Sequence, residues 1–209
     1  MKKILLSLIS VFVYSTVNAA DISYGISVSV MNVDGSGTET QEGDSEKNNG
    51  SANNTVPVGS LFVENNFGSF SLGLDYIPFK ADVSSKTKTR LDTNSAADAP
   101  AEADTGTNKA QAEIKNHVTL YAIYPFSNNL YLKAGVAHMD VETTESLATG
   151  SKYGDDDVFG GQIGIGIQND KFRFGIEYTD YETVSVSSQT GNKVEADLDT
   201  TAVKLSYSF

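Results

Sequence analysis

Apolar and polar residues alternate along the last part of the chain, up to the terminal phenylalanine. Counting back by twos, one set is Phe209, Tyr207, Leu205, Val203 and Thr201, and the other is Ser208, Ser206, Lys204, Ala202 and Thr200. Successive side chains of a β-strand point to opposite faces, so this segment predicts a strand with one apolar and one polar face. Taken alone, such a strand fits a soluble protein as well as a membrane barrel.

Seven upstream segments repeat the pattern, which gives eight predicted strands in all. Six of them are clear: Ile22 to Val30, Phe70 to Tyr76, Val118 to Tyr124, Leu130 to Val136, Ile163 to Ile167 and Phe172 to Tyr178. The seventh, Val56 to Val63, is the weakest, because Pro57 and Gly59 interrupt it and its facing is ambiguous. Strands of about ten residues with one apolar face match a tilted crossing of a bilayer.

The connections between these segments alternate between long and short. The long ones are Asp34 to Thr55, Ala81 to Gln111, Glu142 to Asp157 and Glu182 to Asp197; the short ones are Glu64 to Asn66, Pro125 to Asn129 and Gln168 to Lys171. Outer-membrane barrels have short periplasmic turns and longer extracellular loops. We therefore predict an all-β fold: an eight-stranded antiparallel up-and-down transmembrane β-barrel with four long extracellular loops and three short periplasmic turns. Closure of the barrel removes edge strands, whose unpaired backbone N–H and C=O groups could not form hydrogen bonds with lipid.

The N-terminus has the three parts of an export signal. Lys2 and Lys3 precede an apolar run from Ile4 to Val17, and Val17-Asn18-Ala19 is a small-residue cleavage pattern. The run is shorter than the roughly 20 residues that span a bilayer comfortably. We expect a cleaved signal peptide over residues 1–19, a single barrel domain over residues 21–209, and localisation in the outer membrane.

Composition removes several classes of function. Loss of Lys2 and Lys3 with the signal peptide would take the formal net charge from −12 to −14, which disfavours nucleic acid as a partner. The chain has no Cys, so disulfide frameworks and thiolate metal sites are excluded. It has ten Tyr and ten Phe but no Trp. Because Trp often joins the aromatic belts at the membrane surfaces, Tyr must supply that role alone here.

Three segments carry a family resemblance. They are the terminal Val203 to Phe209, the glycine-rich Gly160 to Gly166 and the segment Leu130 to Gly135. With these segments the chain resembles the small eight-stranded outer-membrane barrels, namely the OmpA-like, OmpX-like and opacity-type, porin-like proteins. The resemblance implies that the barrel-assembly machinery reads the terminal strand through Val203, Leu205, Tyr207 and Phe209. It also implies outer-membrane lipid and lipopolysaccharide as partners.

Six ionisable residues fall on the faces that would line the barrel lumen: Asp75, His117, Lys133, Arg173, Glu177 and Lys204. Unpaired buried charges are costly, so we expect a lumen ion-pair network in an interior just wide enough for its side chains to fill. Glu177 and Lys204 should meet near mid-height. Asp75 and His117 should lie at similar heights, with the remaining two cations nearer the periplasm. A structural plug is the favoured interpretation, and a charge gate on a narrow solute path is the alternative.

Outward aromatic residues fall near both ends of the predicted strands. Tyr124, Phe172, Tyr207 and Phe209 lie toward the short turns, and Tyr76 and Tyr178 lie toward the long loops. Two interfacial girdles are the expected arrangement. His138 also has lipid-facing parity, near the long-loop end of its strand.

The long connections are acidic and rich in small polar residues, which predicts mobile, solvated loops. The acidic residues there are Glu39, Glu42, Asp44, Glu46, Glu142, Glu145, Asp155, Asp156 and Asp157. Their oxygens offer an alternative role, binding of divalent cations that bridge to lipopolysaccharide, but no EF-hand spacing is present. We predict no dedicated metal or cofactor site.

Catalytic signals are weak. His117 and Thr119 share a face, with a faint similarity to the His and Ser pair of outer-membrane lipid A deacylases, but no nucleophilic Ser stands at that spacing. Without a nucleophile, base and orienting group, we predict that the protein is not an enzyme. The favoured function is a structural or surface role in envelope integrity, adhesion or surface recognition. The alternative is a narrow, porin-like channel for small solutes.

Overall fold

The computed structural model describes residues 22–40, 47–94, 102–127, 129–146, 152–189 and 191–209, which form strands and their connections. The strands are β1 (Ile22–Thr40), β2 (Lys47–Asn66), β3 (Ser71–Ile77), β4 (Ala81–Asn94), β5 (Glu102–Pro125), β6 (Leu130–Ser146), β7 (Asp156–Gln168), β8 (Phe172–Tyr181), β9 (Val184–Ser187) and β10 (Lys193–Ser208). In this part of the chain, no helix is long and apolar enough to cross a membrane. The expected signal peptide lies outside the described residues.

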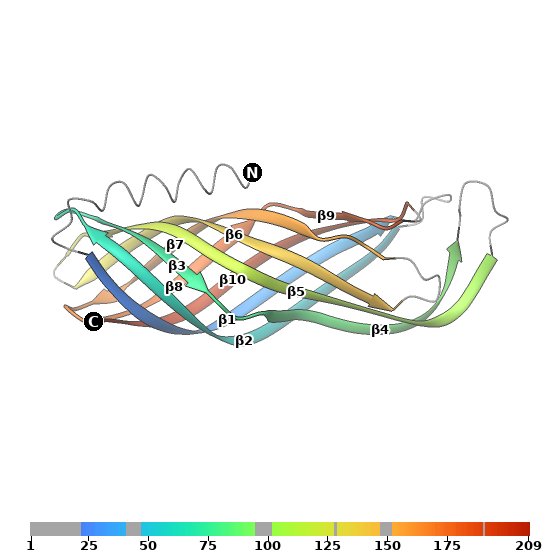
Figure 1. The fold of residues 1–209 in the computed structure, drawn as a ribbon, viewed down its shortest axis with the longest axis horizontal. Helices are drawn as coiled ribbons and strands as arrows, with labels where there is room; N and C mark the ends of the chain where they lie inside the picture. Colours follow the sequence, from blue (N-terminus) through green and yellow to red (C-terminus); the bar gives the residue numbers. More distant parts are fainter. Residues whose placement is uncertain (1–21, 41–46, 95–101, 128, 147–151, 190) are drawn as a thin grey trace.

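The strands form one closed antiparallel barrel (Figure 1). Neighbours follow the order β1, β2, β3, β5, β6, β7, β8 and β10, and β10 returns to pair with β1 from Gly25–Ser208 to Thr40–Lys193. β4 continues beyond β3 along β5, and β9 continues beyond β8 along β10. Each of these two pairs of strands occupies one position in the wall. The predicted eight-stranded barrel is therefore confirmed.

Short connections join β2 to β3, β5 to β6 and β7 to β8 at one end, which we call the short-turn end. The C-terminus lies there too, and the opposite end carries the long hairpins (Figure 1). The strands run much farther into these hairpins than predicted: β1 and β2 stay paired up to Thr40–Lys47, through most of the connection expected over Asp34 to Thr55. Polar cross-strand contacts continue the ladder, for example from Thr38 Oγ1 to Asn49 Oδ1 at 2.8 Å. Backbone pairing needs no apolar side chain, so the strands extend into segments whose composition predicted mobile loops.

A band of large apolar side chains covers the outer face of the barrel toward the short-turn end. Its members include Ile26, Val28, Ile163, Ile165 and Leu205, which are 45–64% exposed. A continuous apolar surface of this kind is typical of contact with lipid. We call it the apolar belt.

Aromatic side chains border the apolar belt at both ends. Tyr124, Phe172 and Phe209 are exposed near the short turns, and Tyr76 and Tyr178 are exposed toward the hairpins. At the seam between β8, β10 and β1, the ring of Tyr207 lies 5.0 Å from that of Phe172 and 5.3 Å from that of Phe209. These positions match the two girdles that the sequence predicts.

The interior changes character along the barrel axis. Toward the short-turn end it holds buried charged residues, among them Glu64, Asp75 and Lys133. Toward the long hairpins it holds an apolar cluster, which we call the upper core: Val33, Ile114, Ala137, Met139, Val141, Val158, Tyr181, Val184, Val186 and Leu198. The sequence predicted a polar lumen throughout, and for this upper part the prediction was wrong. Beyond the belt the outside of the wall is polar, so apolar residues turn inward.

Candidate functional site: an ion-paired lumen

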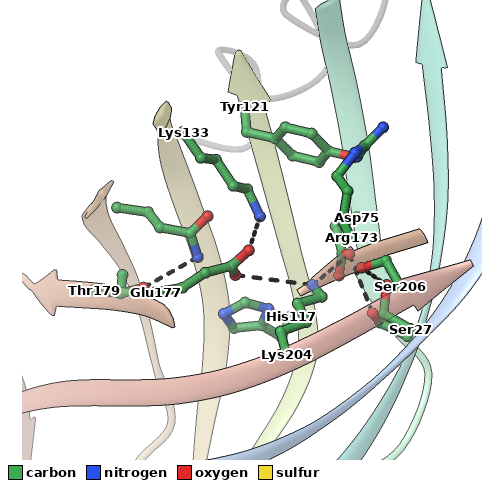
Figure 2. Close-up of polar contacts among 12 residues, drawn as sticks. Ser27, Asp75, His117, Tyr121, Lys133, Arg173, Glu177, Thr179, Lys204 and Ser206 are labelled. Carbon is green, nitrogen blue, oxygen red and sulfur yellow. Dashed lines mark hydrogen bonds and ion pairs between the residues drawn. The ribbon is translucent and has the colours of Figure 1, made fainter. Parts of the chain in front are cut away.

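A chain of alternating charges crosses the lumen between four strands (Figure 2). Lys133 Nζ on β6 lies 2.6 Å from Glu177 Oε1 on β8, and Lys204 Nζ on β10 lies 2.6 Å from Asp75 Oδ2 on β3. Lys204 Nζ also lies 3.9 Å from Glu177 Oε2, which links the two pairs. Ser60 supports the free end of the chain by donating a hydrogen bond of 3.1 Å to Asp75. Four of the six predicted residues therefore form one connected network.

A second ion pair lies nearer the short-turn end and includes a residue that the sequence analysis missed. Arg173 binds Glu64 with two guanidinium nitrogens on the two carboxylate oxygens. Tyr121 donates a hydrogen bond of 2.6 Å to the same carboxylate. Only 2% of the surface of Glu64 is exposed, although the sequence placed it in a turn. The signal was the spacing of Ser60, Phe62 and Glu64, all of which face inward.

The charges of this cluster balance. Three carboxylates, Glu64, Asp75 and Glu177, face three cations, Lys133, Arg173 and Lys204. A buried ion pair loses its hydration and regains free energy only when geometry and further hydrogen bonds are good. Here each carboxylate accepts a hydrogen bond from its cation, and two of them accept another from Ser60 or Tyr121. We call these six residues the lumen plug.

His117 does not join the lumen plug, which corrects the sequence prediction. Its Nε2 lies 2.8 Å from the hydroxyl of Tyr181, and none of the ion pairs among the described residues includes it. The register explains this placement. Asp75 pairs with Thr119, and His117 pairs with Ile77 two residue pairs farther toward the long hairpins, on the same inward face. His117 therefore lies above the plug, against the upper core. His138 keeps the outward parity of its strand, as expected, but it is 93% buried because it packs beside Phe159 and Asp157.

Aromatic rings fill the space around the lumen plug. Tyr121, Ile123 and Tyr131 form a small buried cluster, and Lys133 Nζ lies 4.2 Å from the centre of the Tyr121 ring. Gly73 makes room for that ring, because a Cβ atom there would lie 2.5 Å from Tyr121 Cζ. The cavity left among these groups is about 10 Å³. That is on the order of one water molecule.

The other predicted positions are placed as follows. On β10, Val203 pairs with Val30 and Leu205 with Val28, and the amide of Phe209 donates a 3.0 Å hydrogen bond to the carbonyl of Tyr24. Of the acidic connections, Glu42, Asp44 and Glu46 lie outside the described residues. Glu142 binds Lys80 and Lys115. Within the described ranges, no group of three or more His, Asp and Glu residues is arranged to bind a metal ion.

Solved structures with this architecture are outer-membrane barrels. The outer-membrane protease OmpT of Escherichia coli is 11% identical with a TM-score of 0.52, over 92% of this chain and 98% of that chain. The outer-membrane protein AlkL is 12% identical with a TM-score of 0.51, over 92% of each chain. Ail of Yersinia pestis, in complex with a heparin analogue, is 10% identical with a TM-score of 0.47, over 90% and 99%. No protein-family model and no curated protein matches the chain.

At these identities the similarity establishes the fold, that of small outer-membrane β-barrels. The two structures with TM-scores above 0.5 differ in what their names state, since one is named a protease and the other only an outer-membrane protein. The fold therefore does not decide between an enzyme, a channel and a surface protein.

Proposed function

We propose that this protein is a non-enzymatic outer-membrane barrel with a closed lumen, which acts in envelope integrity, adhesion or surface recognition through the surface it presents beyond the bilayer. The lumen plug is the observation that carries this proposal. The cavity of about 10 Å³ within it accommodates roughly one water molecule. A conducting path needs a continuous file of waters, so the plug favours a structural role over the channel.

The environment of the barrel follows from its outer face. The apolar belt and its aromatic borders match a lipid bilayer, and in lipid only a closed barrel or a helix satisfies all backbone hydrogen bonds. These features support our proposal that the wall contacts outer-membrane lipid and lipopolysaccharide.

The surface role is supported by the length of the paired hairpins. β1 and β2 remain paired through residues 34–40 and 47–55, and β4 remains paired with β5 up to Asn94–Glu102, well past the belt (Figure 1). Paired strands hold polar side chains in fixed positions, which suits recognition better than an irregular loop does. Divalent cations at the acidic hairpins remain a secondary proposal.

A planar-bilayer recording tests the closed lumen. We expect the refolded wild-type protein to show no conductance steps. The matched control is the quadruple variant Glu64→Ala, Arg173→Ala, Lys133→Ala and Glu177→Ala, which removes two ion pairs together and should admit a small ionic current. Steps of constant size from the wild-type protein would overturn the proposal in favour of the channel.

We further propose that Val203, Leu205, Tyr207 and Phe209 form the signal for the barrel-assembly machinery. Deletion of Phe209 should lower the folded fraction of the protein in cells severalfold, as measured by heat-modifiable migration on a gel. The same deletion should leave refolding into detergent nearly unchanged, because Phe209 is 63% exposed. An equal loss in both assays would instead indicate a role in stability.

A further inference from the structure

One part of the barrel wall lacks a hydrogen-bonded seam. β2 pairs with β3 only from Leu61–Tyr76 to Asn66–Ser71, and farther along the wall β4 pairs with β5. Among the described strands, no ladder joins β4 to the facing part of β2. Pro57 lies on this edge of β2 and has no backbone N–H to donate. The side chain of Asn54 bridges the two edges above it, with a hydrogen bond of 2.9 Å to the carbonyl of Asp82.

A cavity of about 100 Å³ lies at this gap and crosses the wall. Part of its lining belongs to the upper core, including Val33 and Met139, which are 2% and 1% exposed. Another part lies on the outer face and includes Pro57, Gly59 and Phe79. Gly59 presents no side chain to the opening, and a Cβ atom there would lie 3.7 Å from the Phe79 ring. The outer end of the cavity therefore lies at Gly59, with the Phe79 ring packed over it, and we call this outer end the wall opening.

The wall opening borders lipid. Gly59 pairs with Val28 and Pro57 pairs with Val30, and both valines are exposed members of the apolar belt. Tyr76 and Phe79 are also exposed on the β3 side. A molecule dissolved in the bilayer therefore meets the opening without crossing water.

The inner end of the cavity carries a polar group without a partner. His117 lines the cavity, and 93% of its surface is buried. Its Nε2 contacts Tyr181, whereas its Nδ1 is buried and has no hydrogen-bond partner in the described structure. Depending on the tautomer, Nδ1 either donates or accepts. A hydroxyl group satisfies both cases because it can do either.

We propose that this cavity binds a small apolar molecule with a single hydroxyl group, which enters from the bilayer through the wall opening and hydrogen-bonds to His117. The size sets the class: an apolar cavity of about 150 Å³ holds one benzene ring, and this cavity, at about 100 Å³, is smaller. A short alkyl chain is therefore the upper limit. A lipid acyl chain shares the apolar body but has no hydroxyl at its end.

The chain offers a convenient probe of this cavity. It has three methionines, and two of them, Met31 and Met139, line the cavity. The full-length mature protein, with ¹³C-labelled methionine methyl groups, is placed in nanodiscs of perdeuterated lipid and titrated with 1-propanol or n-butane. We expect saturable shifts of both methyl signals, with 1-propanol binding about tenfold more tightly, as one hydrogen bond allows.

Three variants locate the site. Val56→Phe should fill the cavity and abolish the saturable shifts, whereas Val30→Phe, one strand away on the belt, should leave them unchanged. His117→Phe should bring the affinities of the two probes to within about twofold, the hydrogen bond being gone. Linear shifts that Val56→Phe does not remove would mean partitioning into lipid and would overturn the proposal. Contacts of Met139 with acyl protons in protonated lipid, unaffected by 1-propanol, would also overturn it and identify a lipid chain as occupant.

Discussion

The two halves of the barrel interior are built from opposite kinds of residue although the same strands form both. Toward the short-turn end the lumen is filled by three ion pairs, and toward the hairpins it is filled by the upper core. The outer face changes in the reverse sense, from the apolar belt to polar hairpins. Apolar residues therefore follow whichever side of the wall is away from water.

β6 shows how one strand accomplishes this change. Its outward apolar residues stand at even positions from Leu130 to Val136, and its inward apolar residues stand at odd positions from Ala137 to Val141. Pairing with β7 continues from Leu130–Ile167 to Val141–Asp156 without a register shift. The backbone is thus unchanged, and only the face that carries apolar residues is exchanged. β10 does the same between Val203 and Leu198.

The largest effect expected in this comparison comes from breaking the lumen plug. Glu64→Ala would leave Arg173, whose side chain is only 18% exposed, without a carboxylate and remove the acceptor of Tyr121. We expect a loss of about 3–5 kcal/mol in the free energy of unfolding, the range for a buried charge that has lost its partner. Urea unfolding in detergent micelles measures it. Glu195→Ala, at an exposed residue on β10, is the control and should change stability little.

Removing both members of the pair sharpens the interpretation. The double variant Glu64→Met and Arg173→Met should be much closer to the wild type than Glu64→Ala, because no unpaired charge remains. A double variant as unstable as the single one would show that the plug contributes more than the pairing of its charges.

The upper core should respond to volume instead of charge. Met139→Ala removes a side chain that is 1% exposed, and we expect a loss of about 2–5 kcal/mol from lost apolar burial and the remaining cavity. The same unfolding assay applies. Val136→Ala, on the lipid face of the same strand, is the control. If both substitutions cost the same, the upper core is not packed as the structure describes.

The outer face gives the third test. Ile165→Lys places a charge in the apolar belt, and we expect a loss of about 2–4 kcal/mol if that position lies near the middle of the bilayer. Thr38→Lys, on the polar hairpin of β1, should change stability by less than about 0.5 kcal/mol. Equal effects on unfolding from lipid vesicles would contradict the assignment of the belt to lipid.

Sequence reasoning located the eight strands and the belt because lipid-facing residues repeat strictly every second position. It placed Lys133, Glu177, Lys204 and Asp75 in the lumen but did not pair Lys133 with Glu177. These two residues lie on strands separated by β7, so their contact depends on barrel curvature and strand tilt, which period two does not encode.

The upper core was missed for a different reason. Val184 and Val186 are buried there, yet their neighbours are so polar that they fall within the predicted connection Glu182 to Asp197. Val141 is buried there too, beyond the predicted strand Leu130 to Val136. The informative signal was the shift of apolar residues from one parity to the other, as between Val136 and Ala137. An analysis that expects apolar residues at only the even or only the odd positions of a strand ends the strand where the apolar residues change from one set to the other.

The smallest expected effect concerns a row of carboxylates on the outer face just beyond the belt. Asp199 on β10 pairs with Asp34 on β1 and with Asp180 on β8. Asp180 is the next residue after Tyr178 on the same face of β8. Partial desolvation, followed by the charges of Asp34 and Asp180, raises the pKa of Asp199 above its usual 3.8. A carboxyl with a raised pKa in the folded state favours folding below its unfolded pKa, and this contribution is lost as pH rises through the folded pKa.

Asp199→Asn should therefore stabilise the protein at neutral pH by a few tenths of a kcal/mol, the scale of a like-charge pair across strands. The gain should shrink as the pH falls toward 3.8, where the wild-type carboxyl is itself protonated. Unfolding curves of both proteins at pH 7 and at acid pH measure the difference, and Asp170→Asn at the short-turn end serves as control. A gain that is the same at both pH values would mean that packing, and not charge repulsion, separates the two side chains. In that case repulsion among the three carboxylates would not destabilise the hairpin region. The row and the charge-balanced lumen plug would then not differ in the electrostatic way that their charges suggest.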